Sequence, residues 1–166
     1  EPAELRAVLA HEAAHIANGH LARRPENADT MSGASRLGLV AGLLAAGVTG
    51  DAGAGAGVAA GMASSAQRVF FSHTRAEEAS ADAAALRYLA RAGVDPTAMA
   101  RVLDRFAGQE LLSTDRQDPY VRTHPLTRDR LRLVANFDGG TATPPDSEAQ
   151  YWFDRSKGKL AAFLNP

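Results

Sequence analysis

Two histidines and a glutamate near the start of the chain have the residue types and the spacing of a metal-dependent hydrolase site. His11, Glu12 and His15 form the pattern H-E-x-x-H. Residues four apart on an α-helix share a face, so His11 and His15 can direct their imidazoles to one point, where a zinc ion would suit them. Glu12 can then reach a metal-bound water and take its proton. The alternative is that two histidines flank a glutamate on a helix by chance.

A catalytic zinc site needs a third protein ligand and one position open for water. Glu78 and Asp82 are four residues apart, so they share one face of a second predicted helix. One carboxylate can bind the metal while the other accepts the second N–H of a ligating imidazole and fixes its tautomer. His73, Glu77 and His124 are further candidates, although Glu77 fits a helix cap better.

The composition limits both the ligands and the partners. The chain has 166 residues, of which 45% are hydrophobic and 22% charged, as in an ordinary soluble domain. The net charge of −1 gives no indication of nucleic-acid binding. There is no cysteine, so a disulfide is excluded and any zinc must bind nitrogen and oxygen ligands.

The pattern of apolar residues, prolines and glycines predicts a mainly α chain without alternating strands. The predicted helices span residues 1–24, 34–48, 54–70, 74–92, 96–107, 127–136 and 147–164. Residues 25–30 are expected to form a polar connection, and 108–122 to be mostly loop. Thr74 and Glu77 fit a capping box. His20 is rotated away from His15 on the helix, so we expect it to be a surface or capping histidine.

Residues 31–68 form an apolar segment dominated by glycine, alanine, leucine and valine. The stretch 49–53 reads as a turn between two helical arms, each shorter than the ~20 residues that cross a bilayer. Two interpretations remain open. The hairpin is either buried against the helices of the site, or it touches a membrane or an apolar partner.

Three motifs in order resemble the zinc peptidases of the CAAX-prenyl-protease type, the HtpX- and BepA-like gluzincins. The first is H-E-x-x-H. The second, T-R-A-E-E-A-S-A-D at 74–82, matches the family pattern S-R-x-x-E-x-x-A-D except for its first residue. The third is His124-Pro125, with Arg130 six residues after the histidine. The resemblance implies a helical zincin-type peptidase region over 1–137, followed by a linker at 138–146 and a C-terminal helix at 147–166.

The resemblance also implies roles for individual residues. One zinc ion per chain would be held by three ligands: His11, His15 and Glu78. Asp82 would support a ligating histidine from behind. His124 would lie at the site, either as an extra ligand in a resting state or as a donor to the tetrahedral intermediate. Arg130 would support the substrate or the oxyanion.

From these observations we expect a zinc-dependent endopeptidase of misfolded or membrane-associated proteins, with Glu12 as general base. The alternative is a latent or chaperone-like client-binding module with a structural zinc. The resemblance implies a bacterial periplasmic, BepA-like or membrane-associated protein with protein or peptide substrates and outer-membrane clients. In relatives a strand-rich segment precedes the H-E-x-x-H helix and a tetratricopeptide-repeat region often follows. This chain contains neither, so we expect it to be a piece of a longer protein.

Overall fold

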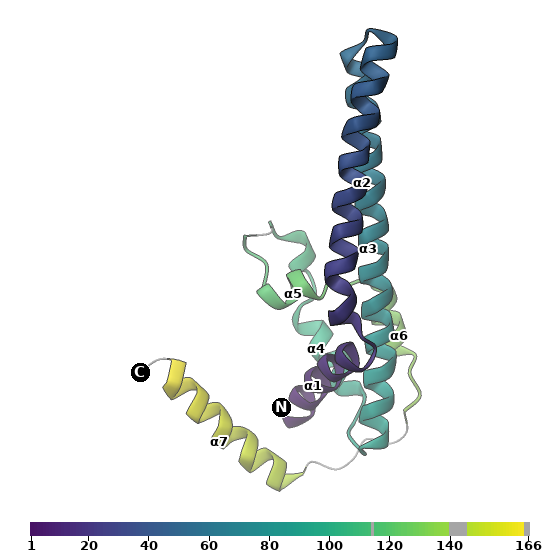
Figure 1. Ribbon diagram of the computed structural model, residues 1–166. Helices are drawn as coiled ribbons and strands as arrows, with labels where there is room; N and C mark the ends of the chain where they lie inside the picture. Colours follow the sequence, from purple (N-terminus) through teal and green to yellow (C-terminus); the bar gives the residue numbers. More distant parts are fainter. Residues whose placement is uncertain (114, 140–145, 165–166) are drawn as a thin grey trace. The chain divides into compact units, whose positions relative to one another are not determined.

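The computed structural model describes residues 1–113, 115–139 and 146–164, and these residues contain helices but no strand (Figure 1). The mainly α prediction is therefore confirmed. The elements are α1 (Pro2–Ala17), α2 (His20–Thr49), α3 (Ala52–Arg91), α4 (Thr97–Arg105), the 3-10 turn η1 (Gln109–Leu111), α5 (Pro119–Thr123), α6 (Arg128–Ala135) and α7 (Ser147–Leu164). The chain divides into two compact units, which we call the core unit (Glu1–Asn18 with Glu78–Pro166) and the hairpin unit (Gly19–Glu77).

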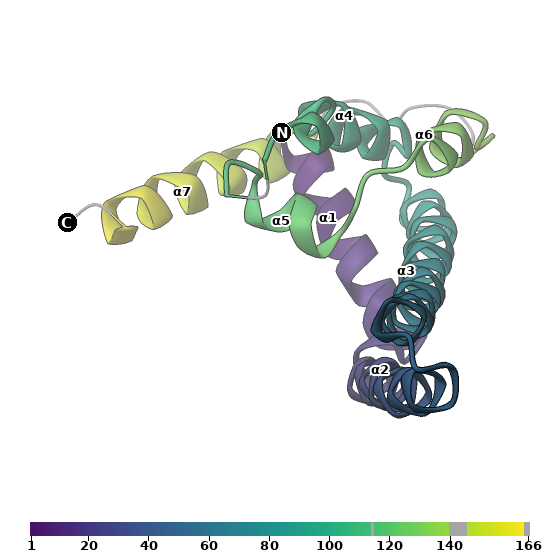
Figure 2. The same ribbon diagram turned by 90° about the horizontal axis from the view of Figure 1, so that it is seen from above.

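The core unit is built from α1, the C-terminal part of α3, α4 and α6, with α4 in contact with both α1 and α6 (Figure 2). Its helices approach closely because alanines lie fully buried on the facing sides. These alanines are Ala7, Ala14, Ala81, Ala85 and Ala98. Larger side chains, among them Leu86, Leu89 and Met99, fill the remaining core. This packing fixes α1 against α3, the two helices that carry the predicted metal ligands.

The first helix ends earlier than predicted. It stops at Ala17 instead of residue 24, because Gly19 adopts φ +68° and allows the chain to change direction. The polar connection predicted at 25–30 is wrong, since α2 begins at His20 and continues through Pro25. Pro25 removes one backbone hydrogen bond near the start of α2 without ending it. His20 is buried, which corrects its predicted place at the surface.

The hairpin unit consists of α2 and the first part of α3, which run side by side (Figure 1). The predicted turn at 49–53 is confirmed. Gly50 ends α2 with φ +69°, and the Asp51 carboxylate accepts a hydrogen bond from Gly53 N at 2.7 Å. The two helices approach closely at Gly42 and Gly55, where an added Cβ on either glycine would lie 2.5 Å from the other's carbonyl oxygen.

The break predicted before Thr74 is also wrong. α3 is continuous from Ala52 to Arg91, and the Thr74 hydroxyl donates to Phe70 O within the helix at 3.2 Å instead of capping one. No proline or glycine lies between Gly61 and Gly93, so a hydroxyl residue alone does not interrupt this alanine-rich run. The hairpin arms are longer than predicted as a result. By length and hydropathy, α2 could cross a membrane, and only 11% of its apolar window is buried.

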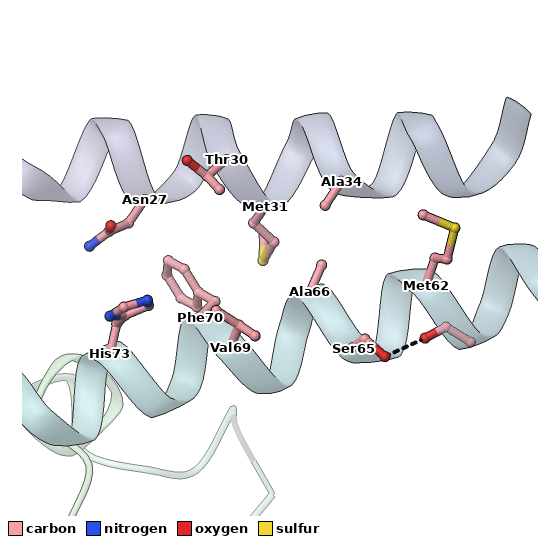
Figure 3. Close-up of a pocket in the computed structure, with 11 residues that line it drawn as sticks. Asn27, Thr30, Met31, Ala34, Met62, Ser65, Ala66, Val69, Phe70 and His73 are labelled. Atoms are coloured by element: carbon pink, nitrogen blue, oxygen red, sulfur yellow. Dashed lines mark hydrogen bonds between the residues drawn. The ribbon is translucent and has the colours of Figure 1, made fainter. Parts of the chain in front are cut away.

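An apolar cavity of about 390 Å³ lies between the two arms of the hairpin unit (Figure 3). Met31 from α2 and Phe70 from α3 project into the space between the helices, and His73 lies at one end. The Ser65 hydroxyl donates to Gly61 O at 2.9 Å within its own helix. The hairpin therefore satisfies this hydroxyl internally.

The later helices agree closely with prediction. Asp95 accepts a hydrogen bond from Thr97 N at 2.9 Å at the start of α4, and the Thr127 hydroxyl accepts one from Arg130 N at the start of α6. The loop predicted at 108–122 contains the short helices η1 and α5. Helix α7 contacts α1 but has no buried residue. Most of the predicted linker, 140–145, lies outside the described residues, as do 165–166 of the predicted last helix.

Candidate metal centre

His11 and His15 lie on the buried face of α1, as their spacing predicts. Their Nε2 atoms are 3.1 Å apart, and both side chains are almost completely buried. Ala7 and Ala14, on the same helix, are fully buried and hold this face against the core. Two imidazole nitrogens are thereby fixed next to each other inside the protein.

Glu78, from α3, meets both imidazoles. Its Oε2 lies 3.3 Å from His11 Nε2, and its Oε1 lies 3.2 Å from His15 Nε2. Ligand atoms about 2.0–2.1 Å from a tetrahedral metal lie roughly 3.3–3.4 Å from one another. The spacing of these three groups therefore fits a zinc-sized ion. Nitrogen and oxygen ligands, with no thiolate, also suit a catalytic zinc site.

His124 offers a fourth possible ligand atom. Its Nδ1 lies 3.1 Å from Glu78 Oε1 and 3.4 Å from His11 Nε2. Possible ligand atoms of His11, His15, Glu78 and His124 all lie within 4.8 Å of one another. His124 follows α5 with φ −126°, as expected for a residue before proline. The four residues can enclose a metal on four sides.

An aromatic stack, which the sequence analysis missed, holds the ring of His124. Tyr120 stacks on His124 with ring centroids 4.6 Å apart, and Phe106 stacks on Tyr120 with ring centroids 5.4 Å apart. Tyr120 lies four residues before His124, but this region was predicted to be a loop. The sequence therefore did not indicate that the two rings lie together. The stack restricts the imidazole to one orientation.

Glu12 lies at the open side of the cluster. Its side chain is partly exposed, and its Oε1 lies 3.5 Å from His124 Nε2. This oxygen is buried and has no hydrogen-bond partner among the described residues. A carboxylate oxygen in this state is available to accept a proton or a water hydrogen.

Behind the cluster, Asp82 and Arg130 form a fully buried pair. Asp82 Oδ1 lies 2.9 Å from His11 Nδ1. Arg130 donates from Nε and Nη2 to the two oxygens of Asp82 at 2.6 and 2.9 Å. Its Nη1 lies 2.9 Å from Glu78 Oε2 and donates to the backbone oxygens of His124 and Pro125. The guanidinium therefore contacts three parts of the site from the inside of the protein.

Two other candidates from the sequence, His73 and Glu77, are not members of the cluster. His73 lines the cavity of the hairpin unit instead. Glu77 is one residue before Glu78 on a continuous helix and so is turned by about 100°. It does not cap a helix, because α3 has no start at Thr74.

The positive charge of protonated His11 and the negative charges of Glu78 and Asp82 stabilise one another. Burial opposes the charged imidazole of His11, but the carboxylates of Asp82 and Glu78 outweigh burial and raise its pKa to about 9. Burial also opposes the charged carboxylates, yet the hydrogen bonds from His11 hold the pKa of Glu78 and of Asp82 below the usual range, with further help from Arg130. In the absence of a metal, His11 therefore carries the proton that a metal must displace.

This raised pKa predicts how the metal-free chain responds to pH. A group whose pKa is higher in the folded state stabilises the fold fully below its ordinary pKa, 6.5 for His11, and loses that contribution as the pH rises through about 9. We expect the free energy of unfolding to fall over this interval by up to roughly 3 kcal/mol. Denaturant unfolding in the presence of a chelator, at several pH values between 6.5 and 9, measures this free energy. A free energy that stays constant or rises over the interval would contradict the prediction.

Comparison with known proteins agrees with this arrangement. Residues 1–137 match peptidase family M48. A beta-barrel assembly-enhancing protease homologue of Vibrio cholerae is 33% identical over 98% of this chain and 38% of its own length. The beta-barrel assembly-enhancing protease of Yersinia pestis is 31% identical over 89% of this chain and 30% of its own length, and that of Escherichia coli 31% over 80% and 27%.

The chain thus spans only 27–38% of the length of these relatives. No solved structure matches it significantly. The family match nevertheless covers α1 and α3 to α6, and so includes every residue of the cluster. The chain therefore belongs to peptidase family M48, a family of metallopeptidases.

Proposed function

We propose that this chain carries the centre of a zinc-dependent endopeptidase, with the metal held by three ligands: His11, His15 and Glu78. The observation that carries the proposal is the spacing of their ligand atoms, 3.1 to 3.3 Å, in a buried cluster of a peptidase family M48 chain. When bound, zinc supplies Lewis acidity, which polarises a peptide carbonyl and makes a water molecule more acidic.

Glu12 is the proposed general base. Its Oε1 makes no hydrogen bond to the described residues, lies 3.5 Å from His124 Nε2 and can accept the proton of the attacking water. The protonated carboxyl can then give this proton to the leaving amine of the cleaved peptide bond. Because Glu12 lies on the same helix as both histidines, the helix backbone fixes the position of its Cα relative to theirs.

Asp82 and Arg130 are proposed to position the ligands. When His11 Nδ1–H donates to Asp82, the lone pair on Nε2 is free for the metal. Arg130 places one positive charge beside the two buried carboxylates and ties the backbone after His124 to the same point. The resemblance implies that Arg130 supports the substrate or the oxyanion. We propose instead that Arg130 positions the metal ligands from inside the protein.

His124 is proposed to act as a latch that fills the fourth position in the resting chain. Its Nδ1 lies as close to Glu78 as the other ligand atoms do, and Tyr120 holds it there. We expect His124→Ala to raise the rate of peptide hydrolysis, because a water molecule gains the fourth position. Initial-rate kinetics measure the effect, with the exposed His73→Ala as the control.

The same variant separates the other roles of His124. A lower kcat with little change in KM would contradict the latch and identify a donor to the oxyanion. Kinetics equal to those of the parent would leave only a structural role at the end of α5.

The closed four-residue cluster also favours a second candidate function. Four protein ligands around zinc are typical of a structural site. In that case the chain would be a latent or chaperone-like module that binds clients without cleaving them. Hydrolysis of an unfolded casein-type substrate, its loss with a chelator and its recovery with added zinc distinguish the two. Client binding without any metal-dependent cleavage would overturn the endopeptidase.

The substrates and location are proposed from the relatives. Their names refer to proteases that enhance β-barrel assembly, so misfolded or outer-membrane proteins are the proposed substrates here. A bacterial periplasmic or membrane-associated location follows from such clients. A tetratricopeptide-repeat region in a longer form of this protein remains part of the proposal. Fractionation that finds the protein only in the cytosol would contradict the location.

A further inference from the structure

We propose that the hairpin formed by residues 37–67 inserts into the hydrocarbon of a lipid bilayer. The first observation is where its small and large residues lie. The helices meet through glycine and alanine: Gly42 faces Gly55 and Ala59, and Gly38 faces Met62. In water, leucines would be expected at such a contact, whereas membrane helices associate through small residues and direct their large apolar residues to lipid.

The large apolar residues of the hairpin do point outward. Leu43 is 75% exposed and Val48 87%. Other exposed side chains of the same kind lie along both arms: Leu37, Leu39, Val40, Leu44 and Val58. So many exposed large apolar residues on one hairpin are rare on soluble proteins and mark a contact with an apolar partner.

The second observation is the placement of charge. No charged residue lies between Arg36 and Asp51 on α2, or between Asp51 and Arg68 on α3. At 1.5 Å per residue, these uncharged runs are about 21 and 24 Å long. Arg36 and Arg68 lie at one end of the hairpin and Asp51 at its tip, with nothing ionised between them. A thin bilayer has a hydrocarbon core of about 27 Å, and long arginine side chains can reach outward to its surface.

The third observation concerns the polar groups of the arms, of which Ser64 and Gln67 lie within four residues of Arg68, where the uncharged run ends. Backbone groups in the arms are satisfied by the helices themselves, as hydrocarbon requires. The Thr49 and Ser65 hydroxyls donate to the carbonyl oxygens four residues earlier, at 2.7 and 2.9 Å. Both hydroxyls can therefore enter lipid without an unsatisfied donor.

Charge placement selects lipid over other apolar partners. A second copy of the chain or a protein client would not require charges to be absent over about 21 and 24 Å of the two arms and present at both ends. A signal sequence would precede the folded domain, whereas α2 follows the H-E-x-x-H helix of the core. The inference is independent of the proposed peptidase activity and would hold if the metal site were purely structural.

Vesicle flotation tests the proposal with the 166-residue chain and liposomes of phosphatidylcholine and phosphatidylglycerol. We expect the parent to float with the vesicles, and the double variant Leu43→Glu with Leu44→Glu to lose at least about tenfold in the bound fraction, because buried charge opposes insertion. The matched control changes another adjacent leucine pair, Leu111→Glu with Leu112→Glu, which lies in the core unit. The control should float like the parent.

A fluorescence measurement keeps the proposal testable if the charged variant loses its fold. Trp152 is the single tryptophan, so Trp152→Phe gives a background in which Leu44→Trp reports on the hairpin alone. Bilayers with brominated acyl chains should quench Leu44→Trp but not Leu111→Trp. Absence of quenching, or flotation of the charged variant like the parent, would overturn the proposal. So would a lipid-free dimer that dissociates with Leu43→Glu while vesicles bind nothing.

Discussion

Replacing Glu12 with glutamine should lower peptide hydrolysis by about 10²–10⁴-fold and leave the metal content unchanged. The amide has nearly the shape of the carboxylate but cannot take a proton from water. Glu12 is partly exposed, and its Oε1 has no hydrogen-bond partner among the described residues, so little stability depends on its charge. Initial rates and elemental analysis of the same preparation measure both quantities.

The exposed Glu148→Gln on α7 serves as the matched control and should behave like the parent. Undiminished hydrolysis in Glu12→Gln would refute the assignment of the general base. Loss of metal from this variant would instead indicate that Glu12 is a ligand. Client binding that persists in a variant without hydrolysis would be compatible with the endopeptidase, since glutamine leaves the surface unchanged.

Arg130→Met should destabilise the chain by about 3–5 kcal/mol. The variant would leave Asp82 and Glu78 buried without the guanidinium that contacts both of them. Because Asp82 would then hold His11 less firmly, we also expect metal affinity to fall by about 10–100-fold. Denaturant unfolding and a zinc competition titration measure the two effects.

A matched control lies two residues along the same helix. Arg132 is 73% exposed and pairs with Asp129 at 3.4 Å, so Arg132→Met should change stability by less than about 1 kcal/mol. If Arg130→Met fails to fold, Arg130→Lys keeps the charge but not the paired donors, and should show an intermediate loss. If Arg130→Met lowers the rate of peptide hydrolysis but leaves stability and metal affinity unchanged, the internal role is contradicted and Arg130 acts on the substrate.

The members of the cluster could be predicted from the sequence because helix geometry is local. A spacing of four residues places His11 and His15 on one face whatever the rest of the chain does. The relation of Glu78 to Asp82 follows in the same way. The order of the three motifs, through the family resemblance, predicted that His124 lies at the site. In the structure His124 is a member of the cluster. The roles of these residues stay predictions.

The contacts of the site could not be predicted, because they depend on tertiary packing. The sequence places Arg130 six residues after His124 but does not indicate that it faces inward to Asp82. The stack of Tyr120 on His124 joins the last helical turn of α5 to the residue after it. The sequence of this region has no helical or strand periodicity, so such a contact cannot be derived from it.

Two predicted helix boundaries are wrong because each depended on the local preference of a single residue. Pro25 lies inside α2 and Thr74 inside α3, although each was predicted to mark the end or start of a helix. Tertiary and neighbouring helical contacts outweigh these local preferences. The hairpin arms are therefore longer than the sequence predicts.

Metal content is the most direct test of the central claim, that His11, His15 and Glu78 hold one zinc ion. Elemental analysis of the purified chain needs neither a substrate nor the rest of a longer protein. We predict one zinc per parent chain and loss of most of it in the double variant His11→Ala with His124→Ala, which keeps only His15 and Glu78 of the four possible ligands. The exposed His73→Ala should keep the parent's zinc. A parent without zinc, or a double variant that retains it in full, would contradict the account.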